Sequence, residues 1–140
     1  MNILAAVDQS DYASLVLKKA FDLATKDDAK VTVMTVSNIS FTNLYVGETP
    51  TNILEKLQEG VDETVKKIKS QAEAARTSVE IVVEESSSPA NAIVDYAEKN
   101  GVDLIVIGSK GMGAIERFLI GSVSSQVVTH APCSVLVVKK

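Results

Sequence analysis

Five short apolar runs alternate with longer segments of helical periodicity along this chain of 140 residues. The runs cover residues 3–7, 31–36, 79–83, 104–107 and 135–138. Continuous apolar strands separated by helices predict a parallel sheet, because each right-handed crossover between parallel strands lays a helix on one face. We therefore predict an α/β fold with a single, doubly wound, five-stranded parallel sheet and helices on both faces.

The segments between the runs carry the signals of amphipathic helices. Helices are predicted over residues 10–24, 51–76, 89–100 and 122–130, with a loop over 37–50. The second helix is expected despite Gly60, because apolar positions step by three and four along it. Ser88 followed by Pro89 is typical of an N-cap with proline at the first helical position. The helix after Pro89 is expected to end where residues 100–101 can take the left-handed cap conformation.

Length, charge and hydropathy restrict the class of protein. The chain fits one domain over residues 1–140, long enough to bury a full core. A net charge of -4 and a pI near 5.0 disfavour nucleic acid as a partner. The apolar runs fall far short of the roughly 20 residues that span a bilayer, and the first residues do not resemble a signal peptide. We therefore expect a cytoplasmic protein without a membrane partner.

Two residue types that often carry chemistry occur once each. Cys133 has no partner for an internal disulfide and precedes an apolar run, so we expect a buried structural thiol. His130 is expected at the end of a helix, and no motif places an acid or a nucleophile around it. No group of His, Cys and carboxylate residues has the spacing of metal ligands. We predict no catalytic residue and no dedicated metal site.

A glycine-rich loop follows the fourth apolar run. Gly108 and Gly111 are separated by two residues, and Gly121 and Ser122 follow after nine more. A buried strand that leads through such a loop into a helix can bind phosphate with its backbone amides. The spacing is not that of a Walker A loop. The dinucleotide fingerprint is also absent, since it should follow the first strand, where residues 8–10 contain no glycine.

The glycine spacing resembles the signature of the ATP-binding branch of the universal stress protein family. The resemblance covers nearly the whole chain, including the opening strand that ends in Asp8 and the segments 97–109 and 131–138. It implies the strand order 3-2-1-4-5, a dimer, and ATP lying over the carboxyl edge of the sheet.

The resemblance also implies which residues contact the nucleotide. It places Asp8 near the ribose, the backbone of Val36 against adenine, Gly108 and Gly111 near ribose and phosphates, and Gly121, Ser122 and Val123 on the phosphates. Mg²⁺ or Mn²⁺ would arrive with the phosphates and be held mainly by their oxygens. Three or four charge-assisted hydrogen bonds of about 1.5–3 kcal/mol each, against an association cost of at least about 4 kcal/mol, are compatible with micromolar affinity.

Simpler explanations exist for single residues of this set. Asp8 can end a strand and favour the next turn, and Gly108 and Gly111 can serve a tight turn. Lys110 and Arg117 can screen phosphate charge or remain solvated. A tight turn would explain Gly108 and Gly111 but not the Gly121-Ser122 pair that follows. The spacing of all four residues therefore favours ligand binding.

We expect an adenine-nucleotide-binding regulatory or stress-response protein without dedicated catalysis. Two alternatives stay open: a slow ATPase on the same site, although the loop serines have no partnered base, and a protein-interaction module with an empty pocket. The last run, 135–138, would be an apolar sheet edge that pairs with a second subunit, which predicts a homodimer. Residues 37–50 are expected to cover the nucleotide.

Overall fold

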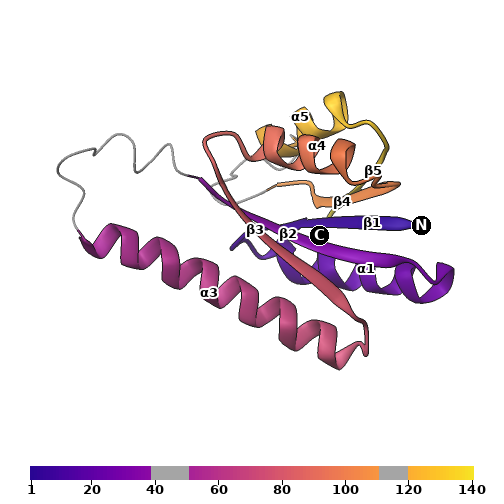
Figure 1. The fold of residues 1–140 in the computed structure, drawn as a ribbon, viewed down its shortest axis with the longest axis horizontal. Coiled ribbons are helices and arrows are strands. Elements are labelled where there is room, and N and C mark those ends of the chain that lie inside the picture. The colour runs from indigo at the N-terminus through magenta and orange to yellow at the C-terminus, as the bar shows by residue number, and fades with distance from the viewer. Residues whose placement is uncertain (39–50, 111–119) are drawn as a thin grey trace.

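The computed structural model describes residues 1–38, 51–110 and 120–140. The described elements are, in chain order, β1 (Asn2–Val7), α1 (Tyr12–Asp27), β2 (Lys30–Asn38), α3 (Thr51–Ala74), β3 (Val79–Ser86), α4 (Pro89–Lys99), β4 (Leu104–Gly108), α5 (Ser122–His130) and β5 (Ser134–Val138) (Figure 1). Every predicted strand and helix is present, with boundaries shifted by a few residues. Within these ranges no helix is both long and apolar enough for a bilayer crossing.

The strands form one parallel sheet in the order β3-β2-β1-β4-β5, which confirms the predicted order. All four neighbouring pairs are parallel, and β1 lies in the middle. Val7 at the end of β1 is level with Thr35 of β2, and Ala6 is level with Ile107 of β4. The carboxyl ends of these three central strands therefore meet at one edge of the sheet.

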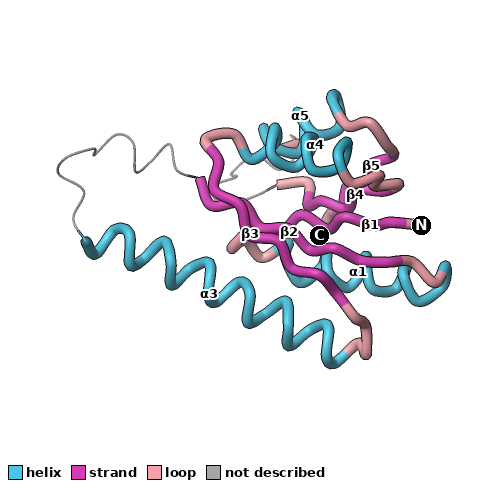
Figure 2. Tube along the Cα trace, in the orientation of Figure 1, coloured by secondary structure: helices cyan, strands magenta, loops and turns pink. Residues whose placement is uncertain are grey.

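Two separate cores pack on the two faces of the sheet. Figure 2 shows α1 and α3 on one side and α4 and α5 on the other. Ile3, Ala5 and Val7 pack toward α1 and α3, whereas Leu4 and Ala6 pack toward α4 and α5. This alternation follows from the period of two along a strand, and it explains why β1 must be apolar throughout.

The second and third strands are longer than predicted. β2 continues to Asn38 and β3 to Ser86, because Ser37 pairs with Glu85 and Asn38 with Ser86. Backbone pairing does not require apolar side chains, so the end of the apolar run was a poor guide to the end of the strand. The loop predicted from residue 37 therefore starts later, and residues 39–50 of the expected cover lie outside the described part of the chain.

The capping signals of α4 are confirmed. Ser88 has extended backbone angles, its side-chain oxygen accepts a hydrogen bond from the Asn91 amide at 3.3 Å, and Pro89 occupies the first turn. Gly101 has a φ of +60° just beyond the helix, in the left-handed region that glycine adopts without strain.

We expect the Ser88→Ala variant to lower the free energy of unfolding by about 1 kcal/mol, because the Asn91 amide loses its acceptor. Urea denaturation measures this change. The matched control is Ser87→Ala, whose side chain is exposed and caps no helix. Equal stability of the Ser88 variant and the unmodified protein would contradict the role of this cap.

Candidate functional site

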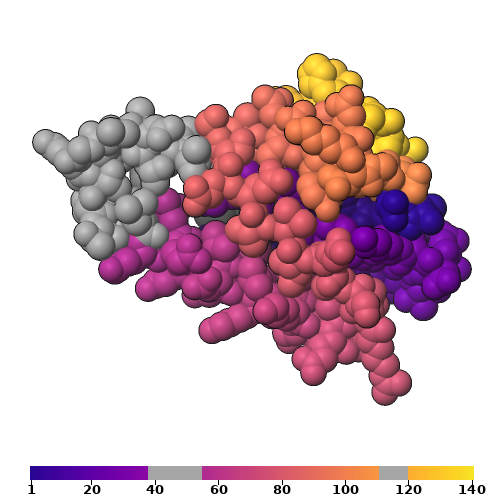
Figure 3. Space-filling view, in the orientation of Figure 1, coloured from indigo at the N-terminus to yellow at the C-terminus, as the bar shows by residue number. Residues whose placement is uncertain are grey.

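A pocket of about 560 Å³ opens at the carboxyl ends of the central strands. The β1–α1 connection, the ends of β2 and β4, the first turns of α4 and α5, and one side of α3 line it. In Figure 3, α3 lies below β3 and α4 on the face turned to the viewer. The pocket lies where the order of the strands reverses around β1, which is the place where doubly wound sheets bind ligands.

The described members of the predicted ligand set all line this one pocket. They are Asp8, Val36, Gly108, Gly121, Ser122 and Val123. Gly111 belongs to the same predicted set but lies outside the described residues, as does Arg117. Lys110 also lines the pocket, half-buried. The fold thus gathers residues that are separated by about a hundred positions in the chain.

Asp8 leads into a tight turn that fixes the start of α1. The Ser10 amide donates to Asp8 Oδ1 at 2.8 Å, and Ser10 Oγ accepts from the Tyr12 amide at 3.3 Å. Because these hydrogen bonds hold residues 8–11 in a turn, α1 begins at Tyr12 instead of at the predicted residue 10. The turn orients the Asp8 carboxylate at the pocket wall, and its structural role is compatible with ligand contact.

The loop between β4 and α5 is tied to the sheet by short hydrogen bonds. The Gly121 amide donates to the Ser109 carbonyl oxygen at 2.7 Å, and the Ser109 amide donates to Val138 O at 2.8 Å. The buried Ser124 hydroxyl donates to the Gly108 carbonyl oxygen at 2.5 Å. These bonds hold the first turn of α5 rigidly against the end of β4.

One of these bonds corrects the expectation that the amides of residues 121–123 all face the ligand. The Gly121 amide is committed to Ser109, so this residue positions the helix and does not donate to a ligand. Within the described ranges no acceptor is recorded for the amides of Ser122, Val123 and Ser124. The first amides of a helix have no acceptor within the helix itself, so these three are available to a ligand as far as the described residues show.

The electrostatics of this pocket wall favour an anion. The aligned peptide dipoles of α5 place about half a positive charge at its N-terminus, and its first turn contains no acidic residue. Lys110 lines the pocket as well and adds a full positive charge. Helix N-terminal amides together with a cation are a suitable environment for a phosphate group.

Part of the pocket wall is apolar. Met34 and Ile93 are buried at 0% and 4% exposure, and Val36 is half-buried beside them. Leu57 and Val61 line the pocket from α3, on the other side of the sheet (Figure 2). The pocket therefore suits a ligand that has both an apolar part and an anionic part.

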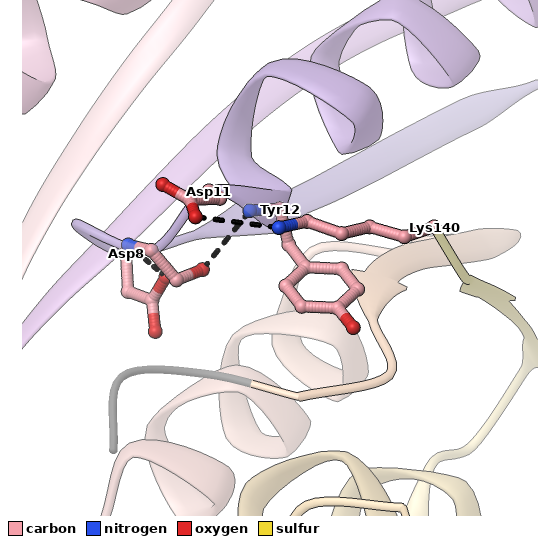
Figure 4. Close-up of polar contacts among 5 residues, drawn as sticks. Asp8, Asp11, Tyr12 and Lys140 are labelled. Atoms are coloured by element: carbon pink, nitrogen blue, oxygen red, sulfur yellow. Dashed lines mark hydrogen bonds and ion pairs between the residues drawn. The ribbon is translucent and has the colours of Figure 1, made fainter. Parts of the chain in front are cut away.

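Tyr12 is a pocket residue that the sequence did not indicate. An added Cβ at Gly108 would lie 2.8 Å from Tyr12 Cβ, so glycine is required here by the packing of α1 on β4. Figure 4 shows Lys140 reaching over Tyr12, with Lys140 Nζ 5.4 Å from the ring centroid and 3.3 Å from Asp11 Oδ2. The presence of glycine at position 108 therefore has a packing reason, in addition to the expected close approach of a ligand.

The expectation for Cys133 needs a correction. The thiol is half-buried instead of fully buried, and it packs on the α4 and α5 core at the margin of the sheet. Burial raises the pKa of Cys133, the Asp103 charge raises it further, and a hydrogen bond involving the Ile105 backbone lowers it. The net direction is upward, so the neutral thiol is favoured.

We expect Cys133 to react more slowly with iodoacetamide at pH 8 than it does in the urea-unfolded chain. Only the thiolate is nucleophilic, and a raised pKa lowers the thiolate fraction at any pH below it. Mass spectrometry of the alkylated protein measures both rates. A faster reaction of the native protein would contradict this assignment.

His130 lies in the last turn of α5, at the opposite end from Gly121, and is exposed. This placement agrees with the favourable interaction expected between a histidine and a helix C-terminus. Among the described residues, no group of three or more His, Cys, Asp or Glu side chains could hold a metal ion.

Fold and site together define a doubly wound α/β protein with an anion-favouring pocket at its topological switch point. A sequence model of the universal stress protein family matches residues 1–139. A putative universal stress protein of Staphylococcus haemolyticus is 38% identical over 144 residues, covering 99% of this chain and 84% of that relative. The chain therefore belongs to the universal stress protein family.

Solved structures of the family share the fold. The structure of a universal stress protein of Lactobacillus plantarum superposes with a TM-score of 0.84 at 28% identity, covering 99% of this chain and 97% of that chain. A universal stress protein of Archaeoglobus fulgidus, solved in complex with dAMP, superposes with a TM-score of 0.66 at 26% identity, covering 98% and 96%.

Proposed function

We propose that this protein binds an adenine nucleotide at the carboxyl edge of its sheet and acts as a nucleotide-dependent regulatory protein of the ATP-binding branch of its family. One observation carries the proposal: a single pocket combines the N-terminus of α5 and Lys110 with the apolar wall around Met34. A base fits the apolar wall, and phosphates fit the amides. The dAMP complex of the Archaeoglobus fulgidus relative supports this choice of ligand.

Each pocket residue has a physical role in this proposal. The carboxylate of Asp8 accepts hydrogen bonds from the ribose, and the backbone of Val36 faces adenine. Ser122 and Val123 donate amides to the phosphates, with Gly121 holding the helix in place. Gly108 brings its backbone close to the ribose and phosphates, and the same role is proposed for Gly111.

A divalent cation has few protein ligands available in this pocket. Asp8 is the one carboxylate among the described residues that line it. Mg²⁺ or Mn²⁺ would therefore be held mainly by the oxygens of the phosphates it accompanies.

The direct test is to purify the protein without added nucleotide, denature it, and identify any released nucleotide by chromatography and mass spectrometry. We expect an adenine nucleotide in the supernatant, or binding of added ATP when the protein is purified empty. If the protein retains no nucleotide and also fails to bind added ATP, the proposal is overturned in favour of a protein-interaction module. Steady ATP turnover that Ser122→Ala abolishes while ATP affinity is retained would replace it with an ATPase.

We also propose that the single domain forms a homodimer through β5, in the cytoplasm. β5 is a sheet edge whose Val135, Leu136 and Val137 remain partly exposed. The other edge strand, β3, carries three glutamates, and such charges discourage edge pairing. Sedimentation at micromolar concentration is expected to show a dimer, and a 14.9 kDa species alone would contradict this pairing.

A further inference from the structure

The long helix α3 is anchored to the body of the protein in its second half. Ile68 and Ala72 are buried in the core that α1 shares with the sheet. Gln71 Nε2 donates to the Ser14 carbonyl oxygen at 2.8 Å, and the Ser14 hydroxyl donates to Gln71 Oε1 at 3.2 Å. These contacts fix the helix from about residue 68 onward.

Residues 55–63, the described side chains in the first half of α3, have different contacts. Its 24 residues make the helix about 36 Å long, and Figure 1 shows its N-terminal end running out past the sheet. Over residues 55–63, Gly60 alone is buried. Leu57 and Val61 are half-buried and line the pocket. Among the described side chains of this half, the buried and half-buried contacts are thus those of Gly60 and of the two pocket-lining residues.

The side chain of Gln9, an exposed residue of the β1–α1 connection, lies against the buried Gly60. A Cβ added at Gly60 would lie 1.7 Å from Gln9 Nε2 and 2.9 Å from Gln9 Cδ, so another residue at position 60 would displace the Gln9 side chain. Glycine inside a helix costs helix stability relative to alanine. This contact gives a physical reason for a glycine in the middle of α3.

Gln9 also belongs to the turn that carries Asp8. The Ser10 amide closes this turn on the Asp8 carboxylate, and both Asp8 and Gln9 line the pocket. The same two residues line a smaller cavity of about 140 Å³ that reaches between α1 and α3. One short turn thus contacts the pocket on one side and the backbone of α3 on the other.

We propose that Gln9 is a positioning residue that couples nucleotide occupancy of the pocket to the first half of α3. This inference rests on the proposed function, because it requires a nucleotide at Asp8. Binding there holds the turn, the turn holds Gln9 on Gly60, and residues 55–63 become more protected. Coupling between two sites is reciprocal, so loosening Gln9 from Gly60 must also weaken nucleotide binding.

The experiment compares backbone amide hydrogen exchange and calorimetric affinity with and without saturating ATP and Mg²⁺. In the unmodified protein we expect ATP to slow exchange in residues 55–63 and in residues 122–125. In both Gln9→Ala and Gly60→Ala we expect the slowing in 55–63 to be lost, the slowing in 122–125 to remain, and the affinity for ATP to fall on the order of 5-fold.

Gly60→Ala is the decisive variant, because Gly60 does not line the pocket and alanine raises the intrinsic helix propensity. We attribute a loss of affinity in this variant to the displaced Gln9 side chain when Gln9→Ala shows the same loss. The control is Glu59→Ala, which changes an exposed neighbouring side chain and is expected to keep the affinity and the slowing of the unmodified protein.

Three results would overturn the coupling. ATP could slow exchange in 122–125 but leave 55–63 of the unmodified protein unchanged, which would remove the coupling and keep the proposed function. Gly60→Ala could retain both the affinity and the slowing in 55–63, with the same consequence. ATP could slow neither segment, and then the proposed function fails as well.

Discussion

Ser122→Asp is expected to stabilise the protein and to weaken nucleotide binding at the same time. A carboxylate in the first turn of α5 interacts favourably with the helix dipole, which raises the free energy of unfolding by about 0.3–1 kcal/mol. The same carboxylate repels phosphate and competes for the first-turn amides of α5. We expect the affinity for ATP to fall about 10- to 100-fold, or about 1.4–3 kcal/mol. Urea denaturation and calorimetric titration measure the two effects.

Gln126→Glu is the matched control for this variant. It adds the same negative charge to the same helix, on an exposed side chain away from the first turn. We expect its ATP affinity to stay within about 2-fold of the unmodified protein, because exposed charges at a distance are screened by salt. Equal loss of affinity in both variants would mean that net charge, and not the α5 N-terminus, governs binding.

Gly108→Ala is expected to destabilise the protein by about 1–3 kcal/mol, because the new methyl group would lie 2.8 Å from Tyr12 Cβ and force α1 and β4 apart. ATP affinity should fall as well, since Tyr12 and Gly108 line the same pocket. Urea denaturation gives the stability and calorimetry gives the affinity.

A double-mutant cycle shows whether the clash with Tyr12 is the cause. Adding Tyr12→Gly removes the atoms that oppose the new methyl group, so the double variant should be less destabilised than the sum of the single variants, by about 1 kcal/mol or more. Gly101→Ala with Tyr12→Gly is the control. Gly101 has no atom within 4 Å of its Cβ position, and its variant is strained only by its φ of +60°. Additive effects in the Gly108 cycle would contradict the packing explanation.

The fold could be predicted because its signals are local. Apolar runs such as residues 104–107 mark strands buried on both faces, and Ser88-Pro89 marks a helix start through the chemistry of a cap. The position of Gly121 and Ser122 at the junction of a loop and a helix could be predicted for the same reason, whereas their contact with a ligand stays a prediction.

The remaining features depend on contacts between distant segments. Nothing near Tyr12 in the sequence indicates that its Cβ meets Gly108, and nothing near Gln9 indicates Gly60. The commitment of the Gly121 amide to Ser109 likewise follows from the path of the loop and not from the residue types. Gly60 was a partial signal, since an unexplained glycine within a helical pattern often has a packing reason.

The most direct measurement for the account as a whole is a calorimetric titration of the purified, nucleotide-free protein with ATP and Mg²⁺, repeated with the Ser122→Asp variant. We expect one site per chain with a dissociation constant in the micromolar range, about 8 kcal/mol of binding free energy, and a clear loss in the variant. No binding to the unmodified protein at millimolar ATP, or undiminished binding to the variant, would contradict a phosphate site at the N-terminus of α5.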